Sequence, residues 1–250
     1  MIASVQRADR LLDLFSGDVT SWSISEMARE LGISKSIVWE YVKTLEDLGL
    51  LRKAGRNRYR LGWRNYQLGI RARLSSEIAE PARNELQNLA SELQESVQLV
   101  TRHKSEVIYL EKIVPANGIR INSTRVGERL PAHTTASGKL LLSILTETEL
   151  EQLYPAKELF RRTGRSIGTR ETLNEHLLRI SRQGFGEDRE ESIKGICGIA
   201  VPIENQHGDM IWALSVSFYE YKWATHAERY RDVLKGAAQR LSKPTQMYDL

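Results

Sequence analysis

Apolar positions follow two different periods along the chain. Through residue 95 they recur mainly every three or four residues, the period of an α-helix, and from Val97 onward runs with strand periodicity alternate with further helical stretches. Strands linked by hairpin turns and interleaved with helices are typical of an α+β domain. The pattern therefore predicts a mostly helical N-terminal part followed by an α+β domain with a mainly antiparallel sheet.

The predicted N-terminal helices are closely spaced. A first amphipathic helix covers residues 4–15, Ser25 is expected to cap a second helix that ends at Gly32, and Ser34 to cap a third. The inward positions of the third helix are Ile37, Val38, Tyr41, Val42, Leu45 and Leu48. A helix, a tight turn and a longer helix together predict a helix-turn-helix motif.

A basic hairpin follows this motif. Gly49 ends the third helix, and residues 50–53 and 59–61 are predicted to be short strands joined by a turn. Such a wing contacts phosphates while the preceding helix lies in the major groove of DNA. The candidate DNA-contacting residues are therefore Ser34, Lys35, Ser36, Trp39 and Lys43 on the helix, and Arg56 and Arg58 on the hairpin.

The charge distribution agrees with this interpretation. Residues 1–74 hold 13 Lys and Arg against 8 Asp and Glu, a net charge of +5, whereas residues 75–250 hold 23 against 24, a net charge of −1. A basic excess confined to one segment favours a polyanionic partner such as double-stranded DNA. A solubilising surface is the alternative explanation of the same charges.

A stretch of small residues precedes a predicted helix in the second half of the chain. Residues 130–145, LPAHTTASGKLLLSIL, place Ala136, Ser137 and Gly138 where backbone amides can approach an anionic ligand. Ser137 lacks the G-x-S-x-G pattern of a nucleophile and has no recognisable His and carboxylate partners. Ligand contact and helix capping are therefore both preferred to catalysis, and no catalytic residue is assigned.

Two hydroxyl groups mark the predicted strand WALSVSF. Ser215 and Ser217 share one face of this strand with Ala213, while Leu214 and Val216 point to the other face. Hydroxyls among small side chains suit a polar ligand. A solvated strand face is the alternative interpretation.

Several other classes of protein find no support. No apolar run reaches about 18 residues and no secretory signal is recognisable, so we expect a cytoplasmic protein without a membrane partner. Cys197 is the single cysteine and the five histidines are scattered, which predicts neither a metal site nor a cofactor. No phosphate-binding loop indicates a nucleotide ligand.

Taken together, these segments resemble the IclR family of bacterial transcription regulators over nearly the whole chain. The resemblance lies in SVQRADRLLDLF, ISEMARELGISKSIVWEYVKTLEDLGLL and YRLG, and further on in IRINSTRVGERLPAHTTASGKLLLS, GFGEDREESIKGICGIAVPI and ALSVS. It implies a winged helix-turn-helix joined by a linker helix to a GAF-like α+β effector-binding domain. The sequence departs from many members at Trp39-Glu40, where His-Arg is common, and at Gly198, where several have Cys.

The same resemblance implies where an effector binds. The small residues at the predicted helix start, an acid and the two strand hydroxyls match positions that line the family's effector pocket, and two further residues match its apolar wall. The implied effector-binding residues are Ile119, Ile121, Ala136, Ser137, Gly138, Asp188, Ser215 and Ser217. A small organic acid is the expected effector.

The expected domain organisation has three parts. Residues 1–66 form the winged helix-turn-helix, residues 67–82 a linker helix, and residues 83–250 the effector-binding domain. Apolar Leu68, Ile70 and Leu74 lie beyond the core of the winged domain, which favours pairing with a second subunit. A homodimer or a dimer of dimers is expected, because one helix and one wing read few base pairs.

The function expected from these patterns is ligand-responsive regulation of transcription. The regulated genes are expected to form a metabolic operon, and a catabolic operon is the first expectation. The protein is not expected to be an enzyme. Two alternatives are a small-molecule enzyme carrying an accessory DNA-binding module and an architectural DNA-binding protein without an effector.

Overall fold

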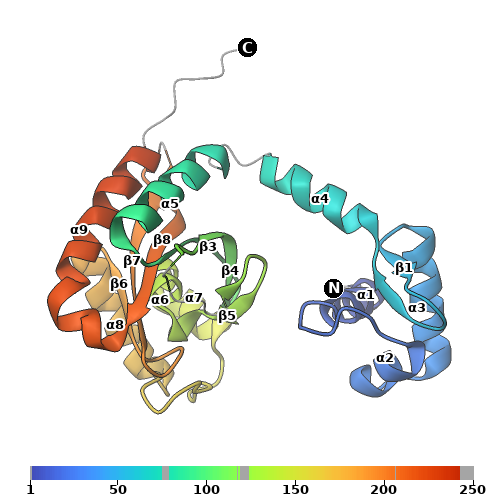
Figure 1. The fold of residues 1–250 in the computed structure, drawn as a ribbon. Helices are drawn as coiled ribbons and strands as arrows, with labels where there is room; N and C mark the ends of the chain where they lie inside the picture. The colour runs from blue at the N-terminus through green and yellow to red at the C-terminus, as the bar shows by residue number, and fades with distance from the viewer. Residues whose placement is uncertain (1, 75–78, 117, 119–123, 206, 243–250) are drawn as a thin grey trace. The chain divides into compact units, whose positions relative to one another are not determined.

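The chain folds into two compact units, which are described separately below. The structure is a computed structural model and describes residues 2–74, 79–116, 118, 124–205 and 207–242. The first unit comprises Met1–Ala79 and the second Glu80–Leu250 (Figure 1). The predicted linker, residues 67–82, is divided between the two units, because residues 67–79 belong to the first unit and residues 80–82 to the second.

The first unit is a winged helix-turn-helix. Its elements are α1 (Ala3–Asp13), α2 (Ile24–Leu31), α3 (Lys35–Asp47), β1 (Leu51–Lys53), β2 (Tyr59–Leu61) and α4 (Trp63–Leu74). The antiparallel pair β1–β2 is the wing. The core of this unit contains Leu11, Phe15, Met27, Ala28, Val38, Val42, Leu45 and Leu51, which come from the helices, the turn after α1 and the first wing strand.

The ends of the two central helices follow capping chemistry. Ser34 caps α3 as predicted, and Gly32 ends α2 with φ 66°, a conformation that glycine adopts without strain. The prediction that Ser25 caps α2 is wrong. The cap is Ser23, because Glu26 lies three residues after it and completes a reciprocal capping box with its backbone.

The end of α3 is joined to the start of α4 by several contacts. Leu48, predicted to face inward, is 47% exposed, because α3 ends at Asp47 and Leu48 lies outside the core. The Asn65 side chain donates to Leu50 O at 2.7 Å, and that of Arg64 to Leu48 O at 3.2 Å. A side chain at Gly62 would lie 2.0 Å from Gly49 O, so this close approach requires glycine.

The second unit contains a six-stranded antiparallel sheet. In chain order its strands are β3 (Ser96–His103), β4 (Glu106–Ile113), β5 (Arg129–Pro131), β6 (Gly186–Arg189), β7 (Ile196–Glu204) and β8 (Met210–Tyr219). The strand order across the sheet is β5-β4-β3-β8-β7-β6, and all of the pairs are antiparallel. This architecture confirms the predicted α+β class.

Helices cover both faces of this sheet. The short helix α6 (Ala136–Leu142) contacts β3, β4, β7 and β8, and α8 (Arg170–Gln183) packs against α6. On the other face, α9 (Trp223–Ser242) contacts β7 and β8, where Phe218 packs edge-on against Tyr230. Helix α5 (Ala79–Leu93) lies beside α9 (Figure 1), joined to it by the Arg240–Glu85 ion pair.

Threonine side chains cap two helices of the second unit, whereas two of its short strands were not predicted. Thr146 forms a capping box at α7 (Glu147–Leu153), and Thr169 caps α8. The unpredicted strands β5 and β6 have only three and four residues, too few to display an apolar alternation. Residues 119–123 lie outside the described residues, and so does the side chain of Leu74.

Candidate DNA-binding surface and effector cavity

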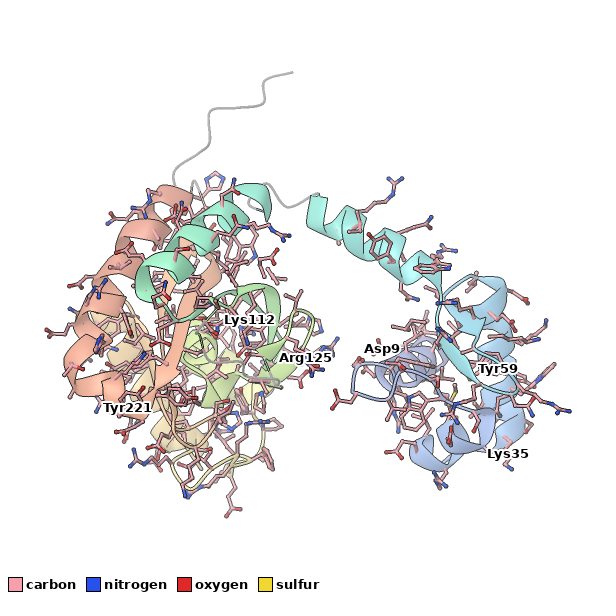
Figure 2. All side chains as sticks on the ribbon, viewed as in Figure 1. Asp9, Lys35, Tyr59, Lys112, Arg125 and Tyr221 are labelled. Atoms are coloured by element: carbon pink, nitrogen blue, oxygen red, sulfur yellow. The ribbon has the colours of Figure 1, made fainter. Side chains whose placement is uncertain are left out.

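The exposed face of α3 carries the residues predicted to contact DNA. Lys35 lies in its first turn (Figure 2), and Trp39 is 53% exposed although its neighbour Val38 is fully buried. Ser34 and Ser36 share a side-chain hydrogen bond of 3.0 Å, and Lys43 forms an exposed ion pair with Asp47. The helix therefore presents polar groups and one indole ring from a fixed scaffold, as a recognition helix does.

The two predicted arginines of the wing differ in their surroundings. Arg56 is exposed in the turn between β1 and β2. Arg58 is held within the unit: its guanidinium donates to Ser21 O at 2.6 Å and pairs with the Glu26 carboxylate at 3.1 Å. Backbone hydrogen bonds between Trp22 and Tyr59 further attach the wing to the segment before α2.

A small cavity lies between α6 and the sheet of the second unit. Its volume is about 30 Å³, comparable to one water molecule's share of liquid volume. The lining residues come from β3, β4, β6, β7, β8, the segment between β4 and β5, the start of α6 and the loop after β6. They are Gln98, Tyr109, Thr124, Thr135, Ala136, Ser137, Asp188, Ser192, Ile193, Ile196, Cys197, Gly198, Ser215, Val216 and Ser217.

Hydrogen bonds join the polar groups on the floor of this cavity. The Ser215 hydroxyl donates to Gln98 Oε1 at 3.0 Å, and Gln98 Nε2 donates to the Ser217 hydroxyl at 3.2 Å. Gln98 and Ser215 are direct cross-strand partners, so both side chains lie on the same face of the sheet. The buried amide of Gln98 thus fixes both serine side chains.

Asp188 is a buried acid in the wall of the cavity. Its Oδ1 accepts hydrogen bonds from the backbone amides of Glu191 at 2.7 Å and Ser192 at 3.4 Å. Burial raises the pKa of the Asp188 carboxyl to about 7, and the Lys139 ammonium opposes this rise while the Glu191 carboxylate adds to it. Asp188 can therefore present a neutral or an ionised carboxyl to a ligand near neutral pH.

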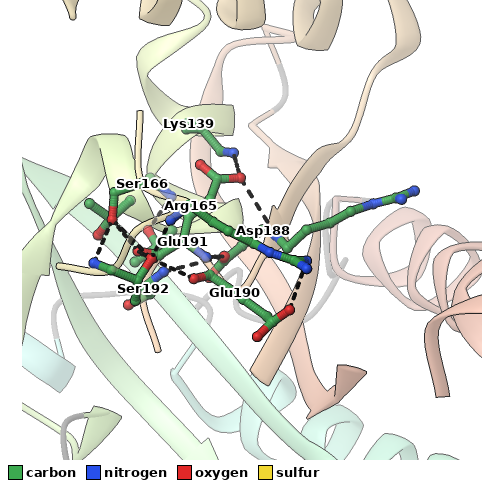
Figure 3. Close-up of polar contacts among 12 residues, drawn as sticks. Lys139, Arg165, Ser166, Asp188, Glu190, Glu191 and Ser192 are labelled. Carbon is green, nitrogen blue, oxygen red and sulfur yellow. Dashed lines mark hydrogen bonds and ion pairs between the residues drawn. The ribbon is translucent and has the colours of Figure 1, made fainter. Parts of the chain in front are cut away.

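A buried ion pair supports this wall from behind. Lys139 of α6, which is 1% exposed, pairs with the carboxylate of Glu191 in the loop after β6 (Figure 3). The Ser166 hydroxyl donates to Glu191 O at 2.6 Å in the same loop. The Ser192 hydroxyl oxygen is buried, and among the described residues it has no hydrogen-bond partner.

The cavity brings together five of the residues predicted to bind an effector, namely Ala136, Ser137, Asp188, Ser215 and Ser217. Gly138 is not among the lining residues. Its amide donates to Thr135 Oγ1 at 2.9 Å, and a side chain there would lie 2.2 Å from Ala132 O, so this glycine permits close packing. Ile119 and Ile121 lie outside the described residues.

Sequence reasoning missed Gln98, Tyr109, Thr124 and Ser192. Gln98 carried a detectable signal, because it is a polar residue within the otherwise apolar strand pattern of residues 97–100. Tyr109 reaches the cavity from β4, and burial raises the pKa of its hydroxyl far above the ordinary range. Cys197 also lines the cavity, and burial raises the pKa of its thiol to about 12, so the thiol is uncharged.

The described part of the chain offers neither a membrane-spanning helix nor a metal centre. No helix within it is long and apolar enough to cross a membrane. Within the same residues, no three His, Cys, Asp or Glu side chains are placed to hold a metal ion.

Comparison with known proteins gives consistent matches over both units. Residues 4–55 match the family model described as IclR helix-turn-helix domain, and residues 71–243 match that of the bacterial transcriptional regulator IclR C-terminal. The chain is 30% identical over 235 residues to the HTH-type transcriptional regulator KdgR of Escherichia coli, covering 93% of this chain and 89% of KdgR. It is 34% identical over 218 residues to XynR of Escherichia coli, covering 87% and 86%.

A solved structure agrees with these matches in fold. An IclR homolog from Microbacterium hydrocarbonoxydans, complexed with 4-hydroxybenzoate, superposes with a TM-score of 0.82 at 24% identity, covering 96% of this chain and 98% of that one.

A winged helix-turn-helix, a polar cavity in a separate α+β unit and these relatives define a DNA-binding regulator of transcription. The chain belongs to the IclR family of bacterial transcriptional regulators. Such regulators bind DNA and small-molecule effectors and are not enzymes, so the alternative of an enzyme with an accessory DNA-binding module is set aside.

Proposed function

We propose that this regulator controls a metabolic, in the first place catabolic, operon and responds to a small organic acid bound in the cavity of its second unit. The observation that carries the proposal is the cavity itself, in which Asp188, Ser215 and Ser217 meet beside the small residues at the start of α6. Buried hydroxyls and an acid suit a ligand that bears a carboxylate and a hydroxyl or keto group. The 4-hydroxybenzoate in the complex of the Microbacterium homolog bears a carboxylate and a hydroxyl group.

The first unit binds operator DNA in this proposal. Lys35, Ser36, Trp39 and Lys43 contact the duplex from α3, with Ser34 at the helix cap, and Arg56 contacts a phosphate from the wing. Arg58 contributes mainly by fixing the wing against Ser21 and Glu26, since its guanidinium is already engaged there. A phosphate contact from the remaining donors of Arg58 is compatible with this role.

The working assembly is a homodimer or a dimer of dimers, and α4 forms part of its interface. Trp63, Tyr66 and Leu68 are 68%, 66% and 51% exposed, an unusual concentration of large apolar side chains on one helix. They adjoin a groove of about 760 Å³ lined by the end of α3, the wing and α4, all within the first unit. A second copy covering this surface would bring two recognition helices to two half-sites.

Ligand binding must enlarge the cavity. A volume of about 30 Å³ is far below that of an acid with six or more heavy atoms, for which binding sites are typically several hundred Å³. The liganded conformation therefore differs from the closed one. A ligand that binds the open form preferentially shifts the equilibrium between the two, which is how the effector alters DNA binding.

The test uses DNA from the intergenic region beside the regulator's own gene. Fluorescence anisotropy should show that the full chain binds this fragment at least about a thousandfold more tightly than an unrelated duplex at the same salt concentration. At least one hydroxy or keto acid from a metabolite panel should change that affinity about fivefold or more. Equal affinity for all duplexes, or no response to any acid, would contradict the proposal.

The effector site itself is tested by calorimetry with the responding acid. Replacing both hydroxyls, Ser215→Ala with Ser217→Ala, should weaken acid binding by on the order of 1–2 kcal/mol for each lost hydrogen bond. Ser143→Ala with Thr225→Ala removes two hydroxyls that do not line the cavity and is the matched control. Unchanged acid affinity in the first double variant would remove the two serines from the site.

A further inference from the structure

A row of polar residues crosses the cavity face of the sheet and ends at a lysine. Ser215 on β8 pairs with Gln98 on β3, and Gln98 pairs in turn with Lys112 on β4. Directly paired residues of neighbouring strands project on the same side of a sheet. The Lys112 side chain therefore extends the floor formed by Gln98 and Ser215.

The Lys112 ammonium reaches the edge of the cavity through a threonine. Its Nζ donates to Thr124 Oγ1 at 2.5 Å, and Thr124 is 4% exposed and lines the cavity. A threonine hydroxyl can accept this hydrogen bond while donating its own proton to another acceptor. Lys112 and Thr124 can thus offer two donors to one anionic group. Lys112 is labelled in Figure 2.

Burial makes this position favourable for an anion. Partial desolvation lowers the pKa of Lys112 to about 8, which means that the charged form is less well solvated than in water. A carboxylate beside Nζ would restore stabilisation of the ammonium through a charge-assisted hydrogen bond.

The acidic wall of the cavity fixes the orientation of such a ligand. Asp188 lies on β6 and Lys112 on β4, with β3, β8 and β7 between them in the sheet. A ligand carboxylate beside Asp188 would face that acid and the nearby Glu191, whereas a hydroxyl could donate to Asp188 and accept from the buried Ser192 hydroxyl. The start of α6 is a weak competitor for the carboxylate, because this helix has seven residues and the Gly138 amide is already donated to Thr135.

We propose that Lys112, together with Thr124, binds the carboxylate of the effector, and that Asp188 and Ser192 contact its hydroxyl or keto oxygen. This assignment rests on the proposed function of the cavity as an organic-acid site. It makes Lys112 the residue that selects acids over neutral analogues. The relevant comparison is therefore between an acid and its own primary amide.

The experiment is calorimetry on the full chain with lactate, pyruvate, gluconate and 4-hydroxybenzoate, each beside its primary amide. The wild type should bind at least one acid about tenfold or more tightly than the amide. Lys112→Met should lose about tenfold or more in affinity for that acid and less than twofold for the amide, while Lys112→Arg should retain most of the preference. Lys157→Met, which removes an exposed lysine outside the cavity, is the matched control and should behave as wild type.

The outcomes separate the two proposals. If an acid binds the wild type and Lys112→Met equally well, the assignment of Lys112 is wrong and the cavity remains an acid site. If no acid of the panel binds, or each amide binds as tightly as its acid, both proposals are overturned. Melting temperatures establish that each variant is folded, and Lys112→Gln, with a neutral donor of similar length, replaces Lys112→Met if that variant is not.

Discussion

The Arg58 guanidinium of the wing pairs with the Glu26 carboxylate of α2 at 3.1 Å, while it also donates to the Ser21 carbonyl oxygen. The wing of this regulator is therefore attached to the first helix of the helix-turn-helix by a side chain that sequence reasoning assigned to DNA alone. The Ser23 backbone amide also donates to Glu26, and hydrogen bonds from Ser23 and Arg58 hold the pKa of that carboxyl below its ordinary value.

The two wing arginines should differ when each is replaced by alanine. Arg56→Ala should weaken binding to every duplex and reduce the slope of log affinity against log salt by about 0.9, because one phosphate contact is lost. Its melting temperature should equal that of the wild type. Arg58→Ala should lower the melting temperature of a fragment of residues 1–79, because it removes the contacts with Ser21 and Glu26. Salt titrations of DNA binding and calorimetric melting temperatures are measured for both variants.

Trp39 should determine sequence preference. Trp39→Ala should change the discrimination between operator variants by about 1–3 kcal/mol at one or two base pairs, because its exposed ring lies on the face of α3 expected to meet base edges. Lys43→Ala is the comparison, since a phosphate contact carries no sequence information. Lys43→Ala should weaken binding to all DNA sequences alike, whereas Trp39→Ala should not. Competition binding with a library of operator variants measures the difference.

Leu68 should hold the dimer together. Leu68→Glu replaces an exposed apolar side chain of α4 with a charged one and should shift sedimentation velocity profiles towards the monomer, with weaker operator binding as a consequence. Leu178→Glu changes a leucine of α8 with nearly the same exposure, 53% against 51%, and should leave the assembly intact. An unchanged assembly in Leu68→Glu would exclude α4 from the interface.

Asp188 should make stability depend on pH in an unusual direction. Because burial raises its folded-state pKa from 3.8 to about 7, the folded chain binds this proton more tightly than the unfolded chain. The resulting stability is fully present below about pH 4 and is lost as the pH rises to about 7, by about 4 kcal/mol.

Asp188→Asn keeps an acceptor oxygen for the Glu191 and Ser192 amides but cannot ionise. Relative to this variant, the wild type should lose stability between pH 5 and pH 8 in urea denaturation of the second unit. Asp232→Asn removes an exposed carboxyl of α9 and is the matched control. Parallel stability curves for wild type and Asp188→Asn would show that Asp188 is ionised in the folded chain throughout this range.

The helix-turn-helix could be predicted closely because its signals are local. Ser34, Gly32 and the apolar spacing of α3 each act within a few residues, and the errors were limited to the cap of α2, predicted as Ser25, and the inward position of Leu48. The serines of β8 were also placed on the correct face, because side chains alternate along any strand.

The rest of the cavity depends on contacts between distant strands. Gln98 contacts Ser215, which lies 117 residues further along the chain. A bulge between Leu99 and Val100 shifts the register between β3 and β4 and so determines the position of Tyr109. No local pattern encodes such a register. Strand β6, which carries Asp188, reads GEDR and gains its conformation only by pairing with β7.

The tight connection between α3 and α4 has a consequence for how far the recognition helices can move. The side chains of Arg64 and Asn65 donate to the backbone oxygens of Leu48 and Leu50, which directly follow α3. We therefore expect α4 and the recognition helix to turn together as one rigid unit. With twelve residues, α4 is about 18 Å long, so a tilt of about 10° displaces its far end by about 3 Å. That displacement is close to the rise of one base pair, about 3.4 Å, so a modest pivot of α4 in a dimer would be enough to put the two half-sites out of step with the double helix.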